Sequence, residues 1–310
     1  MSLAPLAVFA YNRLPHFRQC IEALAANLLA PESDLTVFLD GPKTPADSNL
    51  VDQVRKFARQ IRGFRSLQLV ERESNIGLSA SIIRGVTECC DTSERVIVVE
   101  DDLVTAPHFL QYMNEALDLY QHEERVASIH GHTPPMRQSL PETYFLHDPG
   151  CWGWATWKRA WAHFEPDGAK LLATIQDRRK QREFDWNGAY PYTALLRDQV
   201  LGHNDSWAIR WYATSFLKGS LTLHPGRSLV RNIGFDGTGT HCKPEKYLQA
   251  PLAESPITLR PIEIRENKIA HRAMAEHSWE QRFPRWPRRF AAQILSKARL
   301  LRIPLGRPYP

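Results

Sequence analysis

The eight residues VIVVEDDL, from Val96 to Leu103, join an apolar run directly to a cluster of acids. Four β-branched residues in succession are typical of a strand that is covered on both faces of a sheet. Glu100, Asp101 and Asp102 follow at once, and like charges at a sheet edge raise one another's pKa. A divalent cation relieves this repulsion, so the motif favours a metal site. The alternative is a solvent-facing cap for the following helix.

Strand-like and helix-like patterns alternate along the first part of the chain. Strands are predicted at 6–10, 35–39, 66–71, 95–99 and 126–130, with helices between them. Short links between alternating strands and helices predict an α/β fold with a doubly wound, mostly parallel sheet flanked by helices.

Polar residues follow the predicted strands at the points where the strands end. They are Tyr11-Asn12-Arg13, Asp40, Asn75 and the acids 100–102. Ligands of open α/β sheets bind beyond the carboxyl ends of the strands, so we expect these residues to converge on one rim. Each also has a structural explanation by itself, as a helix cap for Asn12 and as turn residues for Asp40 and Asn75.

Tryptophan gathers in the segment HDPGCWGWATWKRAW, residues 147–161, which holds four of the nine tryptophans. Trp152 and Trp154 bracket Gly153 in a predicted loop, where indole rings suit stacking on a sugar or a base. Trp157 and Trp161 are four residues apart on a predicted short helix and favour the core.

The later chain is predicted to contain two helices, at 191–200 and 207–219. Asp205 or Ser206 is the natural cap of the second helix. Residues 232–242, NIGFDGTGTHC, are rich in glycine and predict a loop, of which residues 234–240 would suit a lid. Proline and polar residues predict an extended connector at 245–261.

The composition limits the class of protein. The chain has 310 residues, 43% of them apolar, which suffices for a sizeable core. Five scattered cysteines form no CxxC pair, which argues against a zinc site and favours a reducing, cytoplasmic setting. We expect neither a signal peptide nor a membrane span.

The net charge is +5, and the excess gathers in residues 282–307. No recognisable nucleic-acid motif accompanies this charge, so nucleic acid is not the expected partner. A basic amphipathic helix is predicted near the C-terminus. It either lies on an anionic membrane as a peripheral anchor or packs on the domain with its charges in water.

The segment VIVVEDDLVTAPHFLQYM resembles the acidic-motif region of inverting glycosyltransferases with the nucleotide-diphosphosugar transferase fold, known as the GT-A fold. Its Glu-Asp-Asp-Leu followed by an Ala-Pro helix start is similar to the N-acetylglucosaminyltransferase I family. The opening PLAVFAYNR resembles that family's first strand and nucleotide-binding turn, and DPGCWGWATWKRAW its acceptor-side segment. GWATW and NIGFDGTGTH also resemble bacterial sugar transferases of surface-polysaccharide clusters.

The resemblance implies roles for the residues of the donor site. Asp102 would bind Mn²⁺, or Mg²⁺, directly, and His241 would touch the metal or the diphosphate. Glu100 and Asp101 would contact the ribose or hold the shape of the site. A UDP-sugar would lie against Ala10, Tyr11, Asn12, Arg13, Asp40, Asn75 and Leu78.

The resemblance also implies an acceptor side, formed by Trp152, Gly153 and Trp154. The family's catalytic base lies in a Trp-Asp-Asp-Trp segment, and the equivalent here is His203–Trp207. Asp205 is the hypothesised base, although alignment on the tryptophans puts Ser206 at the base's place. An Asp in this position is also a natural helix cap.

The implied activity is that of a hexosyltransferase or N-acetylhexosaminyltransferase. It would move a sugar from a UDP-sugar to a hydroxyl of a glycan or glycolipid acceptor, with inversion, in bacterial surface polysaccharide synthesis. Residues 1–135 would bind the nucleotide-sugar, and residues 136–245 would supply the acceptor and catalytic half of the same domain. Residues 246–310 would form the connector and the basic helix.

Two other functions stay open. One is a nucleotidyltransferase of similar fold, which usually carries a glycine-rich loop after the first strand that the sequence YNRLP lacks. The other is a non-catalytic scaffold that binds nucleotide-sugar or polysaccharide, against which the presence of Asp102 argues.

Overall fold

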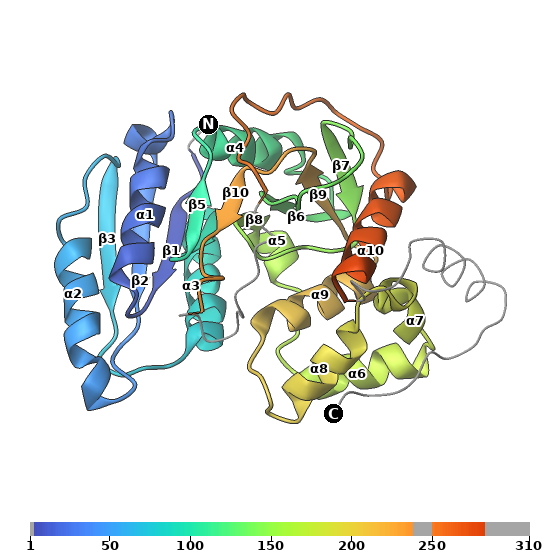
Figure 1. The fold of residues 1–310 in the computed structure, drawn as a ribbon, viewed down its shortest axis with the longest axis horizontal. Coiled ribbons are helices and arrows are strands. Elements are labelled where there is room, and N and C mark those ends of the chain that lie inside the picture. Colours follow the sequence, from blue (N-terminus) through green and yellow to red (C-terminus); the bar gives the residue numbers. More distant parts are fainter. Residues whose placement is uncertain (1–2, 238–249, 283–310) are drawn as a thin grey trace.

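The computed structural model describes residues 3–237 and 250–282, which form a mixed α/β fold around a large central sheet (Figure 1). Within these residues the sheet has eight strands in the order β3-β2-β1-β4-β8-β6-β9-β7, and a separate small sheet pairs β10 with β5. The strands are β1 (Leu6–Ala10), β2 (Asp34–Leu39), β3 (Ser66–Glu71), β4 (Arg95–Glu100), β5 (Leu103–Thr105), β6 (Val126–His130), β7 (Thr143–Leu146), β8 (Trp154–Trp157), β9 (Leu221–Pro225) and β10 (Val230–Asn232).

Helices connect and cover these strands. The longer helices are α1 (Leu14–Ala25), α2 (Ser48–Ala58), α3 (Leu78–Ser93), α4 (Phe109–Leu119), α6 (Gly168–Asp177), α8 (Tyr192–Val200), α9 (Trp207–Lys218) and α10 (Lys268–Arg282). Short helical turns are η1 (Ala30–Glu32), η2 (Pro45–Asp47), α5 (Lys158–Trp161), α7 (Gln181–Phe184) and η3 (Trp186–Gly188).

Two apolar clusters lie on opposite faces of the parallel strands. One packs Leu6 and Val8 of β1 against Phe17 of α1, together with α2 and α4. The other packs Ala7 and Phe9 of β1 against α3 and α9. Successive side chains of a strand point to opposite faces, so a run of apolar residues needs a helix on each face. The predicted doubly wound arrangement of β1 to β4 is confirmed.

The second half of the sheet differs from the predicted, mostly parallel order. β8 lies between β4 and β6 and runs antiparallel to both. β7 also runs antiparallel to β9, whereas β6 and β9 are parallel. The five predicted strands all run in one direction, as predicted, whereas the unpredicted strands β8 and β7 run against them and make the second half of the sheet mixed.

The tryptophans of the 147–161 segment show why this strand was missed. Trp157 ends β8, and the short helix α5 begins only at Lys158. Trp157 packs in the cluster with α1 and α4, whereas Trp161 packs in the cluster with α3 and α9. Both indoles are buried, as predicted, but they do not share one helix face.

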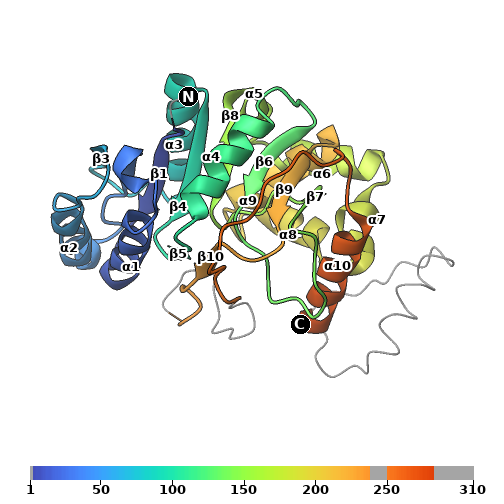
Figure 2. The ribbon, with the colours of Figure 1, turned by 90° about the horizontal axis from the view of Figure 1, so that it is seen from above.

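Helices α6 to α9 gather at one end of the fold, beside α10 (Figures 1 and 2). Figure 2 shows residues 250–267 running as an extended segment from the side of β10 across to α10, in line with the predicted connector. The predicted basic C-terminal helix lies outside the described residues. Among the described helices, none is both long enough and apolar enough to cross a membrane.

Candidate active site

The strand order contains a switch point between β1 and β4. β2 and β3 are added on one side of β1, and β4 is added on the other. The connections after β1 and β4 therefore leave the sheet in opposite directions, and open α/β sheets bind ligands where this happens. Ala10, which ends β1, the turn 11–13 and the acids 100–102 all lie at this point.

A single guanidinium nitrogen holds two of the acids together. Nη2 of Arg13 donates to Oδ1 of Asp101 at 2.7 Å and to Oδ2 of Asp102 at 2.9 Å. The two carboxylates thus converge on one positive charge, as they do around a bound cation. Both aspartates are buried, so this pairing offsets a repulsion that would destabilise the sheet edge.

Burial also changes the protonation of this motif. It raises the pKa of Asp101 to about 6, against the opposing effect of Arg13. Burial, and then the charges of Asp102 and Asp101, raise the pKa of Glu100. Because a bound cation favours ionised carboxylates, a cation that bound here would compete with protons.

The pair of strands β5 and β10 covers the acids from the second half of the chain. Ile233, which follows β10, donates its backbone N–H to the backbone oxygen of Asp102 at 2.8 Å. Gly234 lies so close that a Cβ atom there would stand 2.3 Å from Oδ2 of Asp102. The predicted glycine-rich loop thus begins with a strand end that is fixed against the acidic motif. Three-residue strands leave no periodic signal in the sequence, so this contact was not predicted.

Asp40 joins the ends of two neighbouring strand connections. Its carboxylate accepts backbone N–H bonds from Gly41 at 3.0 Å, Ile76 at 3.0 Å and Gly77 at 2.9 Å. The side chain of Asn75 donates to the backbone oxygen of Gly41 at 3.1 Å. These bonds shape the turn that leads into α3, as the structural explanation of both residues expects.

The other residues predicted to bind the nucleotide make fewer hydrogen bonds. The hydroxyl of Tyr11 accepts from the N–H of Lys43 at 3.0 Å, and the amide of Asn12 donates to Asp47 at 3.5 Å. Helix α1 begins without a side-chain cap, so the alternative role of Asn12 as a cap is wrong. Leu78 is the first residue of α3 and is 44% exposed.

The donor atoms at the switch point suit a hard divalent cation. Carboxylate oxygens are the ligands that Mn²⁺ and Mg²⁺ prefer, and those of Asp101 and Asp102 already converge. Within residues 3–237 and 250–282, no three His, Cys, Asp or Glu side chains are grouped to hold a metal ion by themselves. His241, the other predicted metal residue, lies outside the described residues.

Asp205 precedes α9 but does not cap it. Ser206 is the cap, because its hydroxyl accepts from the N–H of Ile209 at 3.2 Å. The carboxylate of Asp205 is 70% exposed and pairs with Nη2 of Arg210 at 3.3 Å. Arg210 also donates to the hydroxyl of Ser79 in the first turn of α3, so Asp205 is held near the start of that helix.

The three residues predicted to face an acceptor differ in their surroundings. Trp154 is fully buried and stacks on Trp207, so the prediction that its side chain lines a ligand is wrong. As the first residue of β8, it turns into the core between α3 and α9. Gly153 forms a turn with a φ of +62°. Trp152 is partly exposed, and its ring centre lies 5.5 Å from that of Phe235, the neighbour of Gly234.

Two buried histidines hold the loop that carries Trp152. The N–H of Trp152 donates to Nε2 of His130 at 3.4 Å. Nδ1 of His130 lies 3.3 Å from Nδ1 of His224, and Nε2 of His224 lies 2.8 Å from the backbone oxygen of Asp148. A carbonyl only accepts and an N–H only donates, so the consistent assignment protonates Nδ1 of His130 and Nε2 of His224.

This assignment makes both imidazoles neutral. Burial lowers the pKa of His224 to about 4 and lowers that of His130 well below its usual range, which agrees with neutral rings. The sequence signalled neither this pairing nor its role, because the two histidines are far apart in the chain and meet only when β6 pairs with β9.

Comparisons with known proteins give limited likenesses. No family model matches the sequence, and no curated protein matches it. The solved structure of TarS from S. aureus is 16% identical with a TM-score of 0.31, and the match covers 46% of this chain and 25% of the TarS chain. The chain thus spans about a quarter of the length of TarS.

A second solved structure is the mannosyltransferase PcManGT from Pyrobaculum calidifontis in complex with GDP-Man and Mn²⁺. It is 12% identical with a TM-score of 0.35, and the match covers 69% of this chain and 74% of that chain. Both TM-scores lie below 0.5.

Proposed function

We propose that this protein is a metal-dependent glycosyltransferase of the GT-A fold. It moves a sugar from a UDP-sugar to a hydroxyl of a glycan or glycolipid, with inversion. The proposal is carried by one observation, the convergence of the Asp101 and Asp102 carboxylates on a single positive charge at the switch point of the sheet. The diphosphate of a nucleotide-sugar is an anion that such a site binds through a shared cation.

Arg13 adds to this binding site with its second terminal nitrogen. Nη1 of Arg13 is buried and has no hydrogen-bond partner among the described residues. A buried N–H without a partner costs free energy, and a phosphate oxygen would satisfy it with a charge-assisted bond. We propose that Arg13 binds the diphosphate, while Tyr11 and Asn12 contact the nucleoside beside it.

Asp102, with Asp101 beside it, would hold the Mn²⁺ or Mg²⁺ ion. The ion supplies Lewis-acid stabilisation of the charge on the departing diphosphate. The protein holds Asp102 in position, because Ile233 donates to its backbone oxygen and Gly234 lies against its carboxylate. This cover limits the access of water, which competes with the acceptor for the sugar.

We propose Asp205 as the general base that takes the proton of the acceptor hydroxyl. Its carboxylate is largely exposed, and Arg210 is the cation paired with it within the described residues. An exposed carboxylate is accessible to an incoming hydroxyl, as a general base requires. Trp152, which remains partly exposed, is proposed to contact the acceptor.

We propose that three successive segments of the chain have different roles. Residues 1–135 bind the UDP-sugar, residues 136–245 bind the acceptor, and residues 246–310 form the connector and a basic tail. The excess of positive charge in residues 282–307 would attach the protein to anionic lipid at the inner face of the cytoplasmic membrane. A role in bacterial surface polysaccharide synthesis, with a hexose or N-acetylhexosamine as the transferred sugar, fits this setting.

The proposal is tested by incubating the protein with a panel of UDP-sugars and Mn²⁺ and measuring the UDP that is released. We expect one donor to give UDP with Mn²⁺ and none with a chelator. Release of pyrophosphate from a nucleoside triphosphate and a sugar phosphate would instead identify a nucleotidyltransferase. Binding of a UDP-sugar without any product would identify a non-catalytic scaffold.

A further inference from the structure

Asp148 is an acid without a paired cation among the described residues. It lies in the loop between β7 and β8, and its carboxylate accepts one hydrogen bond, from the N–H of Gly150 at 3.2 Å. The residue is partly exposed, yet the protein around its carboxyl is dense enough that burial raises its pKa to about 6. A carboxylate in such a place has further lone pairs that can accept hydrogen bonds.

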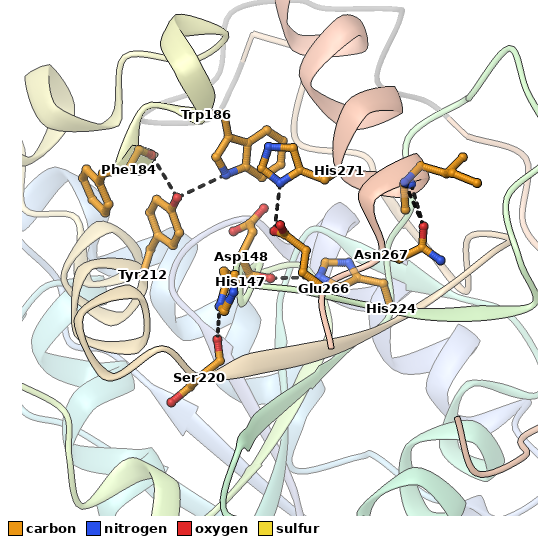
Figure 3. A network of polar contacts seen from close by, with 12 residues as sticks. His147, Asp148, Phe184, Trp186, Tyr212, Ser220, His224, Glu266, Asn267 and His271 are labelled. Carbon is orange, nitrogen blue, oxygen red and sulfur yellow. Dashed lines mark hydrogen bonds and ion pairs between the residues drawn. The ribbon is translucent and has the colours of Figure 1, made fainter. Parts of the chain in front are cut away.

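The loop that carries Asp148 is fixed from several sides (Figure 3). His224 donates to the backbone oxygen of Asp148, and Nδ1 of His147 donates to the backbone oxygen of Ser220 at 2.7 Å. Gly150 has a φ of +59°, and a Cβ atom there would lie 2.3 Å from the ring of His130. The carboxylate is therefore held in place before any ligand arrives.

Aromatic side chains from the helical end of the fold lie beside this acid. Figure 3 shows Asp148 next to Trp186 and to Tyr212 of α9. The ring of Tyr192 in α8 lies 5.9 Å from that of Trp186 and 4.6 Å from that of Tyr212. The hydroxyl of Tyr212 is already used, because it accepts from Nε1 of Trp186 at 3.1 Å and donates to the backbone oxygen of Phe184 at 2.9 Å. The hydroxyl of the partly exposed Tyr192 has no hydrogen-bond partner among the described residues.

The histidine of α10 that faces this acid is already engaged. His271 of α10 faces this region, but its Nδ1 bonds to Glu266 at 2.8 Å, and its ring packs 5.4 Å from that of Trp186 (Figure 3). Asp148 and Tyr192 are thus left with unused hydrogen-bonding capacity, while the polar groups around them are satisfied. Rings beside a few polar groups are the typical composition of a site for a small polar ligand.

We infer that the carboxylate of Asp148 and the hydroxyl of Tyr192 form a subsite that binds a sugar of the acceptor. The inference rests on the proposed glycosyl transfer and adds the second substrate to it. The carboxylate accepts from one sugar hydroxyl, and the phenol donates to a sugar oxygen. The nearby ring of Tyr190, 4.5 Å from that of Tyr192, offers an apolar surface to the sugar's C–H groups.

The position of the loop connects this subsite to the donor site. Four residues after Asp148, the ring of Trp152 meets Phe235, next to the glycine that covers Asp102. An acceptor glycan bound at Asp148 would therefore extend along the loop toward the acids at the switch point. Asp148 binds the acceptor in this account, whereas proton removal is assigned to Asp205.

Binding of simple sugars tests the subsite directly. The probes are methyl glycosides of glucose, galactose, mannose and N-acetylglucosamine, titrated by saturation-transfer NMR into the full chain with UDP and Mn²⁺ present. We expect the wild type to bind at least one glycoside, and Asp148→Asn and Tyr192→Phe each to weaken it by about tenfold. Asp198→Asn, which removes an exposed acid on the same helix as Tyr192, is the matched control and should bind as the wild type does.

The outcomes separate the subsite from the donor site. UDP affinity is measured on the same samples, and we expect it to be equal in all four proteins. Glycoside binding that is unchanged in both Asp148→Asn and Tyr192→Phe, or absent from the wild type, would overturn the subsite. Failure of the wild type to bind UDP would overturn the proposed glycosyl transfer instead. Thermal unfolding of each variant verifies that a loss of binding is not a loss of fold.

Discussion

Arg13 has two terminal nitrogens with different roles, because one donates to the acids and the other is proposed to bind the diphosphate. Nη2 holds Asp101 and Asp102, and Nη1 is buried without a partner among the described residues. A metal ion at the acids would meet the same two carboxylates that Arg13 now neutralises. Arg13 therefore stabilises the site while no cation is present, and it is placed to turn its charge toward the diphosphate once one binds.

Replacing Arg13 by Gln leaves two buried carboxylates without their cation. We expect Arg13→Gln to lower the free energy of unfolding by about 3 kcal/mol in the absence of metal. Mn²⁺ should then raise the melting temperature of Arg13→Gln more than that of the wild type, because the ion replaces the missing charge. Arg84→Gln, at an exposed position of α3, is the control. An equal Mn²⁺ shift in all three proteins would contradict the shared site.

Asp205 and Ser206 are neighbours with separable roles. We expect Asp205→Asn to lower kcat by about a hundredfold, since an amide cannot accept a proton as a carboxylate does, and to leave stability unchanged. Ser206→Ala should cost about 1 kcal/mol of stability through the lost cap and should keep most of the turnover. Turnover and urea unfolding of both variants check this. Near-normal turnover of Asp205→Asn would remove it as the base.

At the scale of single residues, the sequence predicted best where a motif coincides with a strand end. Asp101, Asp102 and Arg13 follow buried strands, so the switch-point rule places them together. Asp148 lacked such a signal, because an acid before Pro-Gly is typical of an ordinary turn. Trp154 was misjudged because burial depends on a neighbouring strand that local sequence does not reveal.

The paired strands β5 and β10 are the element that joins the two halves of the proposed site. β5 follows the acids directly, and β10 comes from a segment more than a hundred residues later. Their pairing presses Gly234 against Asp102, so the backbone around the acids is fixed by long-range contacts. Long-range pairing of such short strands has no local pattern from which it could be predicted.

A methyl group at position 234 tests this contact. Gly234→Ala places a Cβ atom 2.3 Å from Oδ2 of Asp102, so the acid or the strand end has to shift. We expect the Mn²⁺ concentration needed for half-maximal UDP binding to rise about tenfold. Gly168→Ala is the control, because its Cβ atom meets chiefly the movable amide of Gln199. Equal Mn²⁺ requirements in both variants would show that Asp102 is not held by this strand pair.

Among the larger elements, the alternating half of the chain and the later helices α8 and α9 were predictable, whereas the placement of the later strands was not. Strands β1 to β4 have the length and apolar character that the sequence shows, and helices lie between them. For the residues of β8 the sequence predicts a loop and a short helix instead, because Trp157 and Trp161 are four residues apart. A four-residue strand placed between β4 and β6 is specified by its tertiary neighbours instead.

At the scale of the whole molecule, the neutral pair His130 and His224 connects the second half of the sheet to the loop before β8. The two rings connect β6 to β9 and fix the loop from Asp148 to Trp152. Protonation of either ring would remove an acceptor from this chain of hydrogen bonds and would place a charge in the core. The fold and the proposed acceptor loop therefore depend together on these histidines staying neutral.

The pH dependence of stability follows from this pair. The folded pKa of His224 is about 4 and its ordinary value is 6.5, so the unfolded chain binds more protons between them. The contribution of His224 to the free energy of unfolding should be fully present above about pH 6.5. As the solution is acidified below this pH, the contribution should fall by about 1.4 kcal/mol per pH unit. Asp148, with its raised pKa, contributes in the opposite sense over part of this range.

Comparing the wild type with His224→Gln isolates the histidine. Urea unfolding at several values between about pH 7 and pH 5 should show a steeper loss of stability in the wild type. The contribution of Asp148 is common to both proteins and cancels in the difference. Parallel pH profiles for the two proteins would mean that His224 is not held neutral in the fold.

The central claim is that a cation and a nucleotide diphosphate bind together at Asp102. Calorimetric titration of UDP into the wild type and Asp102→Asn, each with Mn²⁺ and with a chelator, tests it most directly. We expect Mn²⁺ to tighten UDP binding to the wild type by at least about tenfold and to leave binding to Asp102→Asn unchanged. Equal UDP affinity of the wild type with Mn²⁺ and with chelator would contradict the account.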